Sequence, residues 1–341
     1  MTAMERIQAA LRLDAAAEVP VIPQLFGFTA KICGVPLLDY VSSGDTLARC
    51  QLKTRERFGY DAVFGVMDVN VETEAVGSSL TYRPDQYPTV ASHVLVNPSA
   101  LNALPVPDPC RAGRMPEILS ALNIMRREVR DDVPVVGLVL GPLTLTTQLM
   151  GMERALYLAI DAPDEFTKVL AFAAEVITLF GKAQLEAGAH LIMIFDPVSS
   201  PAVVPPYFFK EFELPLLTRA FAEFKQEGSM ANWLHIAGPV EPILPYYGSA
   251  GVDIANIDYQ VEPAVALLQL PATCINGNLK SAAFICSSPE EIHEDSVRLR
   301  EAFQTRGGFI LSSGCEIPPE SRPENVAALV AAARNRGWLN G

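Results

Sequence analysis

Side chains that can do chemistry stand at the ends of a series of apolar runs in this chain. The four most telling positions are Asp68 in AVFGVMD, Asp196 in HLIMIFD, His235 in NWLHIAG and Cys315 in GFILSSGCE. Strand packing alone does not explain such endings, because buried strands favour apolar residues. We therefore expect one active site built around these residues, with Asp68, Asp196 and His235 as its catalytic groups.

A second set of side chains has the polarity needed to hold a small molecule. We predict that substrate is bound by Asn70, Gln148, Asn276, Asn278 and Cys315. Amides pair with the donors and acceptors of a ligand, and an amide lost from such a buried pair leaves a costly unpaired group.

Each of these residues also has a purely structural interpretation. Asp68 and Asp196 are good N-cap residues for helices that follow strands. His235 fits a hydrogen-bonded histidine of the core, and Cys315 fits a small buried apolar residue. The polar surroundings of Cys315 in SSGCE favour the site over the core.

The elements that would position these residues alternate between strand and helix. Short apolar runs predict eight strands, at 19–24, 62–68, 133–141, 190–196, 232–238, 252–258, 273–279 and 308–316. Helical patterns lie between most of them, including 163–187, 208–227, 289–305 and 323–337. Eight such repeats predict an α/β fold of the (β/α)8 TIM-barrel type, whose active sites lie at the carboxyl ends of the strands. The alternative is a doubly wound open sheet, which normally carries a GxGxxG turn after its first strand, and this chain has none there.

One segment departs from the repeat. Residues 70–115, after the second strand, are too long for an ordinary strand-to-helix loop. We interpret them as a hairpin-like insertion that covers one side of the barrel mouth, within a single domain of residues 1–341.

Composition excludes several classes of partner. The net charge of −13 repels nucleic acid, and no apolar run reaches the roughly 18 residues that a membrane span needs. The first residues lack the apolar core of a signal peptide, and the six cysteines show no CxxC pairing. We expect a cytoplasmic protein that binds neither nucleic acid nor membrane.

Taken together, the strand-end motifs resemble those of the uroporphyrinogen decarboxylase superfamily. The motifs, in order along most of the chain, are DVNVETEAVG from Asp68, GPLTL at 141–145, FDP at 195–197, HIAG at 235–238, GNL at 277–279 and SSGCEIPP at 312–319, followed by PENV. The resemblance implies the TIM-barrel fold already expected from the repeat.

Two branches of that superfamily must be separated. The decarboxylases hold their substrate carboxylates with arginines in an N-terminal segment, and the corresponding stretch 22–34 contains none. They also have Tyr where this chain has Gln148, and His where it has Cys315. These departures argue against decarboxylation.

The other branch, the corrinoid-dependent methyltransferases, resembles this chain more closely. Members acting on thiols such as coenzyme M bind zinc through an HxC motif and a later Cys, and this chain has His235, Ala237 and Cys315 at those positions. The resemblance implies methyl transfer from cobalamin on a separate corrinoid protein to a small-molecule acceptor. With one ligand missing, we expect no zinc, with His235 and Cys315 as its weak alternative ligands, and we expect tetrahydrofolate as the acceptor because its N5 amine needs no metal.

Three other functions stay open. They are a zinc-dependent transferase to a coenzyme M-like thiol, a decarboxylase, and a barrel that binds a corrinoid or pterin without catalysis.

Overall fold

Seven parallel strands form one curled sheet in the computed structural model, which describes residues 1–15 and 18–335. The strand order is β1-β4-β5-β6-β7-β8-β9, so neighbours in space follow one another along the chain. The strands are β1 Val63–Gly65, β4 Val135–Leu140, β5 Leu191–Phe195, β6 Asn232–His235, β7 Ile254–Asn256, β8 Cys274–Leu279 and β9 Phe309–Ser313. Each lies within a predicted run, which confirms the barrel expected from the sequence.

The predicted strand at 19–24 closes the barrel without forming a regular ladder. Val21 forms a single parallel bridge with Leu311, and the backbone N–H of Asp61 donates to the carbonyl of Val21 on the other side, at 2.8 Å. Pro20 and Pro23 have no N–H to donate, so a longer ladder cannot form here. The segment therefore occupies the position of the eighth strand in the barrel, although it is not a regular strand.

The Asp61 carboxylate reinforces this seam. It accepts the Val21 N–H at 2.8 Å, the Arg6 guanidinium at 2.6 Å and the Arg334 guanidinium at 2.7 Å. Arg6 lies in the first helix and Arg334 directly follows the last one. Elements from both ends of the chain therefore hold the same carboxylate.

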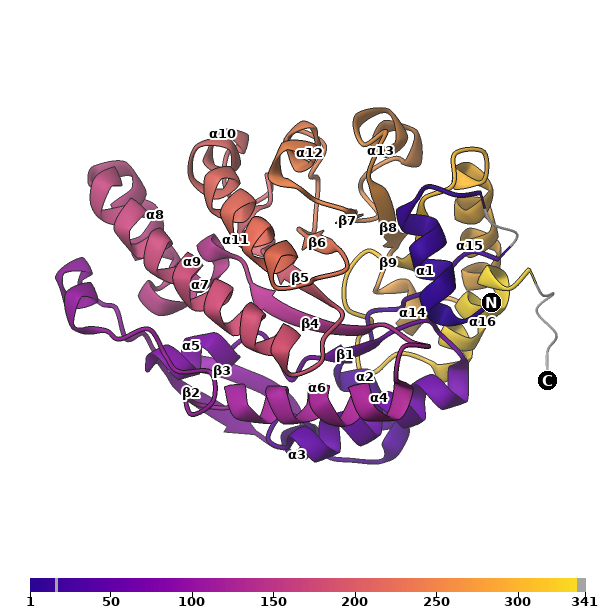
Figure 1. The fold of residues 1–341 in the computed structure, drawn as a ribbon, viewed down its shortest axis with the longest axis horizontal. Helices are drawn as coiled ribbons and strands as arrows, with labels where there is room; N and C mark the ends of the chain where they lie inside the picture. Colours follow the sequence, from indigo (N-terminus) through magenta and orange to yellow (C-terminus); the bar gives the residue numbers. More distant parts are fainter. Residues whose placement is uncertain (16–17, 336–341) are drawn as a thin grey trace.

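Helices surround the sheet (Figure 1). In the first part of the chain they are α1 Ala3–Leu11, α2 Gly27–Cys33, α3 Leu37–Tyr40, α4 Gly44–Phe58, α5 Val71–Val76, α6 Met115–Val129, α7 Pro142–Met150, α8 Met152–Asp161 and α9 Pro163–Glu186. Later come α10 Pro206–Phe208, α11 Leu214–Gln226, α12 Tyr247–Ala250, α13 Pro263–Gln269, α14 Ala283–Cys286, α15 Pro289–Phe303 and α16 Pro323–Ala333. Short 3-10 turns are Pro98–Ala103, Pro197–Ser199 and Leu244–Tyr246.

The helix predicted at 208–227 is not continuous. A π-helical turn, Phe209–Glu213, separates α10 from α11. Such turns are rare and occur often at functional sites.

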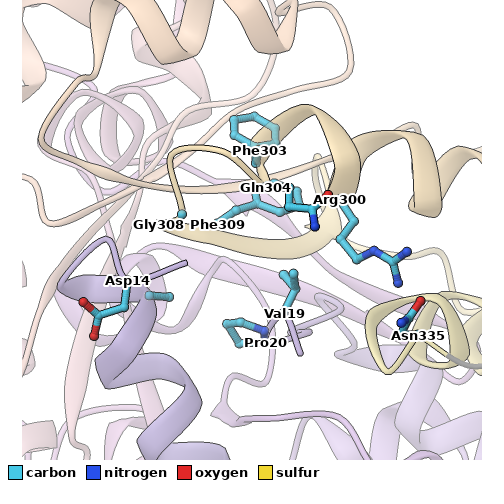
Figure 2. Close-up of a pocket in the computed structure, with 11 residues that line it drawn as sticks. Asp14, Val19, Pro20, Arg300, Phe303, Gln304, Gly308, Phe309 and Asn335 are labelled. Carbon is cyan, nitrogen blue, oxygen red and sulfur yellow. The ribbon is translucent and has the colours of Figure 1, made fainter. Parts of the chain in front are cut away.

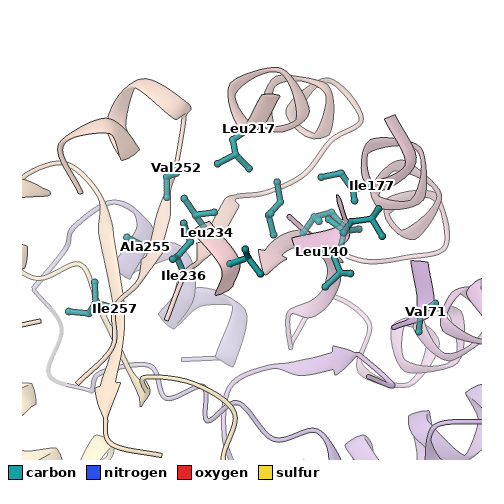
Figure 3. Close-up of a cluster of buried hydrophobic side chains, with 14 of the residues drawn as sticks. Val71, Leu140, Ile177, Leu217, Leu234, Ile236, Val252, Ala255 and Ile257 are labelled. Atoms are coloured by element: carbon teal, nitrogen blue, oxygen red, sulfur yellow. The ribbon is translucent and has the colours of Figure 1, made fainter. Parts of the chain in front are cut away.

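Two apolar layers hold the barrel together. Inside it, Phe64 and Trp233 pack with their ring centroids 6.2 Å apart. Outside it, strand residues such as Leu234 and Ala255 meet helix residues such as Leu217 and Ile177 (Figure 3). Side chains of each strand alternate between these layers, so every strand is buried on both faces.

The segment 70–115 contains an antiparallel hairpin, β2 Ser79–Arg83 with β3 Gln86–Ser92.

Among the described residues, no helix is long and apolar enough to span a membrane. All six cysteines are free thiols.

Candidate functional site

The predicted site residues His235, Asn278 and Cys315 lie at or near the carboxyl ends of β6, β8 and β9, and Asn276 lies in the middle of β8. His235 is the last residue of β6, the two asparagines belong to β8, and Cys315 follows β9. In a parallel barrel these ends meet at one mouth.

A row of polar side chains crosses the barrel below that mouth. His235 pairs in register with Asn256 of β7, and Asn256 pairs with Asn276 of β8. All three are fully buried. The Asn256 amide donates to the Asn276 side-chain oxygen at 2.9 Å, and the Asn276 amide donates to the Ile310 carbonyl at 3.3 Å.

His235 is the unsatisfied member of this row. Both of its ring nitrogens, and the side-chain oxygen of Asn256, lack a hydrogen-bond partner. Buried polar atoms without partners are rare in proteins and call for an explanation such as a ligand or water. Burial lowers the pKa of His235 to about 3, so the ring is neutral at physiological pH. A neutral imidazole with free nitrogens can bind a ligand or a metal.

Cys315 is tied to the end of β8. The Ser281 hydroxyl donates to the Cys315 carbonyl at 2.9 Å and accepts from its N–H at 3.2 Å. Burial raises the pKa of the Cys315 thiol to about 11. The sulfur is therefore protonated at neutral pH unless a metal binds it.

Asp68 has a partner that the sequence did not reveal. The guanidinium of Arg114, at the end of the insertion, forms an ion pair with Asp68 and donates to Glu74 at 2.7 Å. The Asn70 backbone N–H donates to Asp68 at 2.8 Å, and the Asn70 side chain donates to the Pro88 carbonyl of β3 at 2.7 Å. Asp68 and Asn70 thus tie the insertion to the end of β1.

Asp196 is also fully engaged. Its carboxylate accepts the Thr144 N–H at 3.0 Å, the Thr144 hydroxyl at 2.5 Å and the Ser199 hydroxyl at 2.6 Å. Glu213, from the π-helical turn, lies beside it, and burial together with the Asp196 charge holds the pKa of Glu213 well above its ordinary value. Asp196 thus connects β5 to the GPLTL turn. Residue 141 in this turn must be glycine, because a Cβ there would overlap the Asp196 carboxylate.

Gln148 does not join the asparagine row through any hydrogen bond. Its side-chain oxygen accepts a hydrogen bond from the hydroxyl of Thr73 in α5. Glu72, also in α5, is buried, and its carboxylate accepts the Leu140 N–H at 2.9 Å. Desolvation raises the pKa of Glu72 to about 7.

The hairpin is fastened to two segments that lie far from it in the sequence. The Tyr87 hydroxyl of β3 donates to Glu316 at 2.5 Å and accepts the Gly27 N–H at 2.6 Å. A Cβ on Gly27 would come within 2.6 Å of that hydroxyl, so the contact depends on glycine. Glu316 directly follows Cys315, so one end of the fastening lies beside a predicted site residue.

A separate pocket lies at the opposite end of the barrel. Its wall includes Pro20, directly before the Val21 bridge, and Phe309, the first residue of β9, with Phe303 and Arg300 of α15 (Figure 2). None of the predicted site residues lines it. This pocket is therefore distinct from the candidate site.

Fold and site together define an α/β barrel whose strand ends carry a buried imidazole, a row of amides and a thiol. The profile of the uroporphyrinogen decarboxylase (URO-D) family matches residues 2–336, and the chain belongs to that family.

Individual relatives are named for two activities. The methylcobamide:CoM methyltransferase MtaA of Methanosarcina barkeri (strain Fusaro) is 29% identical over 84% of this chain and 84% of its own length. A methyltransferase structure from Methanosarcina mazei superposes with a TM-score of 0.88, at 27% identity, over 98% of this chain and 99% of the other. The uroporphyrinogen decarboxylase of Thioalkalivibrio sulfidiphilus is 26% identical over 88% of this chain and 86% of its own length.

These relatives correct two expectations about cofactors. MtaA is named for coenzyme M, which is a thiol, and not for tetrahydrofolate. The folate acceptor predicted from the sequence is therefore wrong. The expectation of no zinc, which rested on Ala237 in place of a cysteine, is corrected as well, because a thiol acceptor, unlike the folate amine, must lose a proton to become a strong nucleophile.

The residues present do not by themselves complete a zinc site. His235 and Cys315 occupy two of the three positions implied by the family motif, and Ala237 occupies the third. Within the described ranges, no three His, Cys, Asp or Glu side chains are grouped as metal ligands. This donor set falls short of the three protein ligands of a catalytic zinc site, so the steps below are derived from side chains alone.

Proposed function

We propose that this protein transfers a methyl group from a methylated corrinoid, carried by a separate protein, to a small thiol of the coenzyme M type. The observation that carries the proposal is the similarity to MtaA and to the M. mazei methyltransferase over most of the chain. The similarity extends across the barrel and its insertion.

The proposed reaction is a direct displacement at the methyl carbon. The thiol sulfur attacks the methyl carbon, the cobalt–carbon bond breaks, and cobalt keeps the bonding pair as Co(I). The thiol proton leaves to water, and the product is a methyl thioether. Because the step is a direct displacement, its rate depends strongly on how the sulfur and the methyl group are aligned.

The side chains divide into two roles under this proposal. His235, Asn276, Asn278 and Cys315 line the acceptor site, where the unprotonated ring nitrogen of His235 accepts a hydrogen bond from the thiol. Asp68 and Asp196 act as positioning residues, since their carboxylates are already held by Arg114 and by Thr144. Gln148 and Asn70 hold the insertion in place, because Gln148 is hydrogen-bonded to Thr73 of α5 and Asn70 to Pro88 of β3.

Decarboxylation of a polycarboxylate is less well supported. That substrate needs free cations, and no arginine lies in residues 22–34. Arg114 does reach the mouth, but Asp68 and Glu74 already neutralise its charge. A buried guanidinium that already pairs with two carboxylates has little charge left with which to bind a third.

The test is a methyl-transfer assay with methylcobalamin as donor. We expect wild type to methylate coenzyme M and to leave tetrahydrofolate unmodified. His235→Leu should lower the rate at least about 100-fold, the usual scale for losing one well-placed catalytic contact. His190→Gln, directly before the first residue of β5 and so at the opposite end of the barrel from His235, is the matched control and should retain activity.

Three outcomes would contradict the proposal. They are transfer to tetrahydrofolate alone, release of carbon dioxide from uroporphyrinogen without methyl transfer, and corrinoid binding without any turnover.

A further inference from the structure

Three loops beside Cys315 are locked into one unit. The Asn278 amide donates to the carbonyls of Asp258, at 3.2 Å, and Val261, at 2.8 Å, which fixes the loop after β7 to β8. Ser281 fixes the loop after β8 to Cys315. The backbone of these loops is therefore held close to that of Cys315.

Gly314 completes the lock. A Cβ at this position would lie 3.0 Å from the Cα of Asp258 and 3.1 Å from the backbone nitrogen of Tyr259. Contacts this short are rare between real atoms, so the loop after β9 lies flush against the loop after β7 because residue 314 is glycine. The two loops and the β8 loop then share one surface.

Lys280 and Tyr259 meet on this unit. The Lys280 ammonium lies 5.2 Å from the centroid of the Tyr259 ring, and both side chains are exposed. A cation over an aromatic face is attracted to it. The ring thus restrains the ammonium near the mouth while leaving its other side open to solvent.

The charge of Lys280 is not neutralised by a carboxylate. Among the described residues, no Asp or Glu lies within ion-pair distance of its nitrogen. Arg114, another cation at the mouth, is paired with Asp68 and Glu74. Lys31, on α2, donates to the Ser321 carbonyl at 3.2 Å. Lys280 thus carries a charge that no described carboxylate neutralises, and its neighbour Ser281 is bonded to the Cys315 backbone.

We propose that Lys280, held by Tyr259, binds an anionic tail on the thiol acceptor and so selects short thiols that end in a sulfonate or carboxylate. The proposal rests on the thiol transfer proposed above. A chain with net charge −13 repels anions in general. A single free ammonium beside the site offsets that repulsion locally.

The test varies the charge on the protein and the charge on the acceptor together. Wild type, Lys280→Gln and Lys280→Arg are assayed with methylcobalamin and three thiols: mercaptoethanesulfonate, mercaptopropionate and the uncharged mercaptoethanol. Lys53→Gln, on the outer helix α4, removes the same charge from an exposed position and is the matched control.

The expected result is specific to the charged acceptors. Lys280→Gln should raise KM for both anionic thiols about tenfold, as for the loss of one charge-assisted hydrogen bond, with kcat little changed. Its KM for mercaptoethanol should not move. Lys280→Arg should stay close to wild type, and Lys53→Gln should match wild type with every thiol.

Two results would overturn the inference. One is an equal rise in KM for the charged and uncharged thiols, and the other is the same effect in Lys53→Gln. Calorimetric binding of mercaptoethanesulfonate to wild type and Lys280→Gln separates the two proposals. If the variant binds this thiol more weakly but wild type does not methylate it, the anion site stands and thiol methylation is refuted. If wild type methylates the thiol but both proteins bind it equally, thiol methylation stands and the anion site is refuted.

Discussion

Asp68 and Arg114 form a buried ion pair although 46 positions separate them in the sequence. The Asp68 side chain is 1% exposed, and Arg114 also donates to the Val41 carbonyl at 2.9 Å. The pair therefore joins the end of β1, the end of the insertion and the segment after α3. Its loss would disturb three connections at once.

Arg114→Met should destabilise the protein by about 3–5 kcal/mol, because it leaves a buried carboxylate without its counter-charge. Urea denaturation of wild type and variant measures this difference. Arg111→Met is the control, since that side chain is 86% exposed and its ion pair with Asp108 spans 3.6 Å. It should change the free energy of unfolding by less than about 1 kcal/mol. Equal effects of the two substitutions would contradict a structural role for the Asp68 pair.

Glu72→Gln should make the protein more stable than wild type at neutral pH but not in acid. Burial raises the Glu72 pKa from 4.5 to about 7, so the folded state holds its proton more tightly than the unfolded state. The stability linked to that proton is fully present below pH 4.5 and is lost as the pH rises to 7, by about 1.4 kcal/mol per pH unit at most. Glutamine does not titrate, and its side-chain oxygen can still accept the Leu140 N–H.

The measurement for Glu72→Gln is the difference in unfolding free energy between variant and wild type across this range. The difference should grow between pH 4.5 and 7 and then level off. A difference that stays constant with pH would show that Glu72 is ionised in the folded protein throughout.

Gly314→Ala should impair use of the acceptor while leaving the barrel folded. The new methyl group pushes the Tyr259 segment away from Cys315, because its neighbours there are backbone atoms that cannot rotate aside. We expect KM for the thiol to rise several-fold, with circular dichroism unchanged. Gly248→Ala in α12 is the control, since a Cβ there meets nothing within 4 Å. Unaltered kinetics in Gly314→Ala would mean that the contact between the two loops is loose.

Ala237→Cys should raise the affinity for zinc over that of wild type. The substitution restores the middle ligand of the HxC motif, two positions after His235. Each added thiolate strengthens a zinc site, so retention during dialysis against a weak chelator should increase at least about tenfold. Ala237→Ser, similar in size but a poor zinc ligand, is the control. Equal zinc content in Ala237→Cys and Ala237→Ser would show that residue 237 does not face the His235 ring.

Most of the barrel was predictable because its strands are continuous apolar runs. The segment 19–24 was predicted as an ordinary strand, and only the structure shows how its two prolines limit it to one bridge. The helix at 208–227 also looked continuous, since a π-helical turn such as Phe209–Glu213 keeps the apolar spacing on both sides. Local patterns identify these elements but do not fix their irregularities.

The site was predictable only in part, for a related reason. Asn276 and Asn278 stood out as polar residues within an apolar strand, and Asn256 in VDIANID carried the same signal without being singled out. Arg114 gave no local signal, because it reaches Asp68 only through the fold of the insertion. The acceptor was mispredicted because Ala237, in place of the middle cysteine of the HxC motif, favoured an acceptor that needs no metal.

The grip of Arg6 and Arg334 on Asp61 affects how the chain is made. The contact between Asp61 and Arg334 spans 273 positions. During synthesis Arg6 and Val21 can reach Asp61 early, but the bridge to Leu311 and the Arg334 contact form only after those residues have left the ribosome. Until then Val21 faces an incomplete barrel, with exposed strand edges of the kind that promote aggregation. Closure of the barrel is thus a late step, which needs β9 and the residue that follows α16.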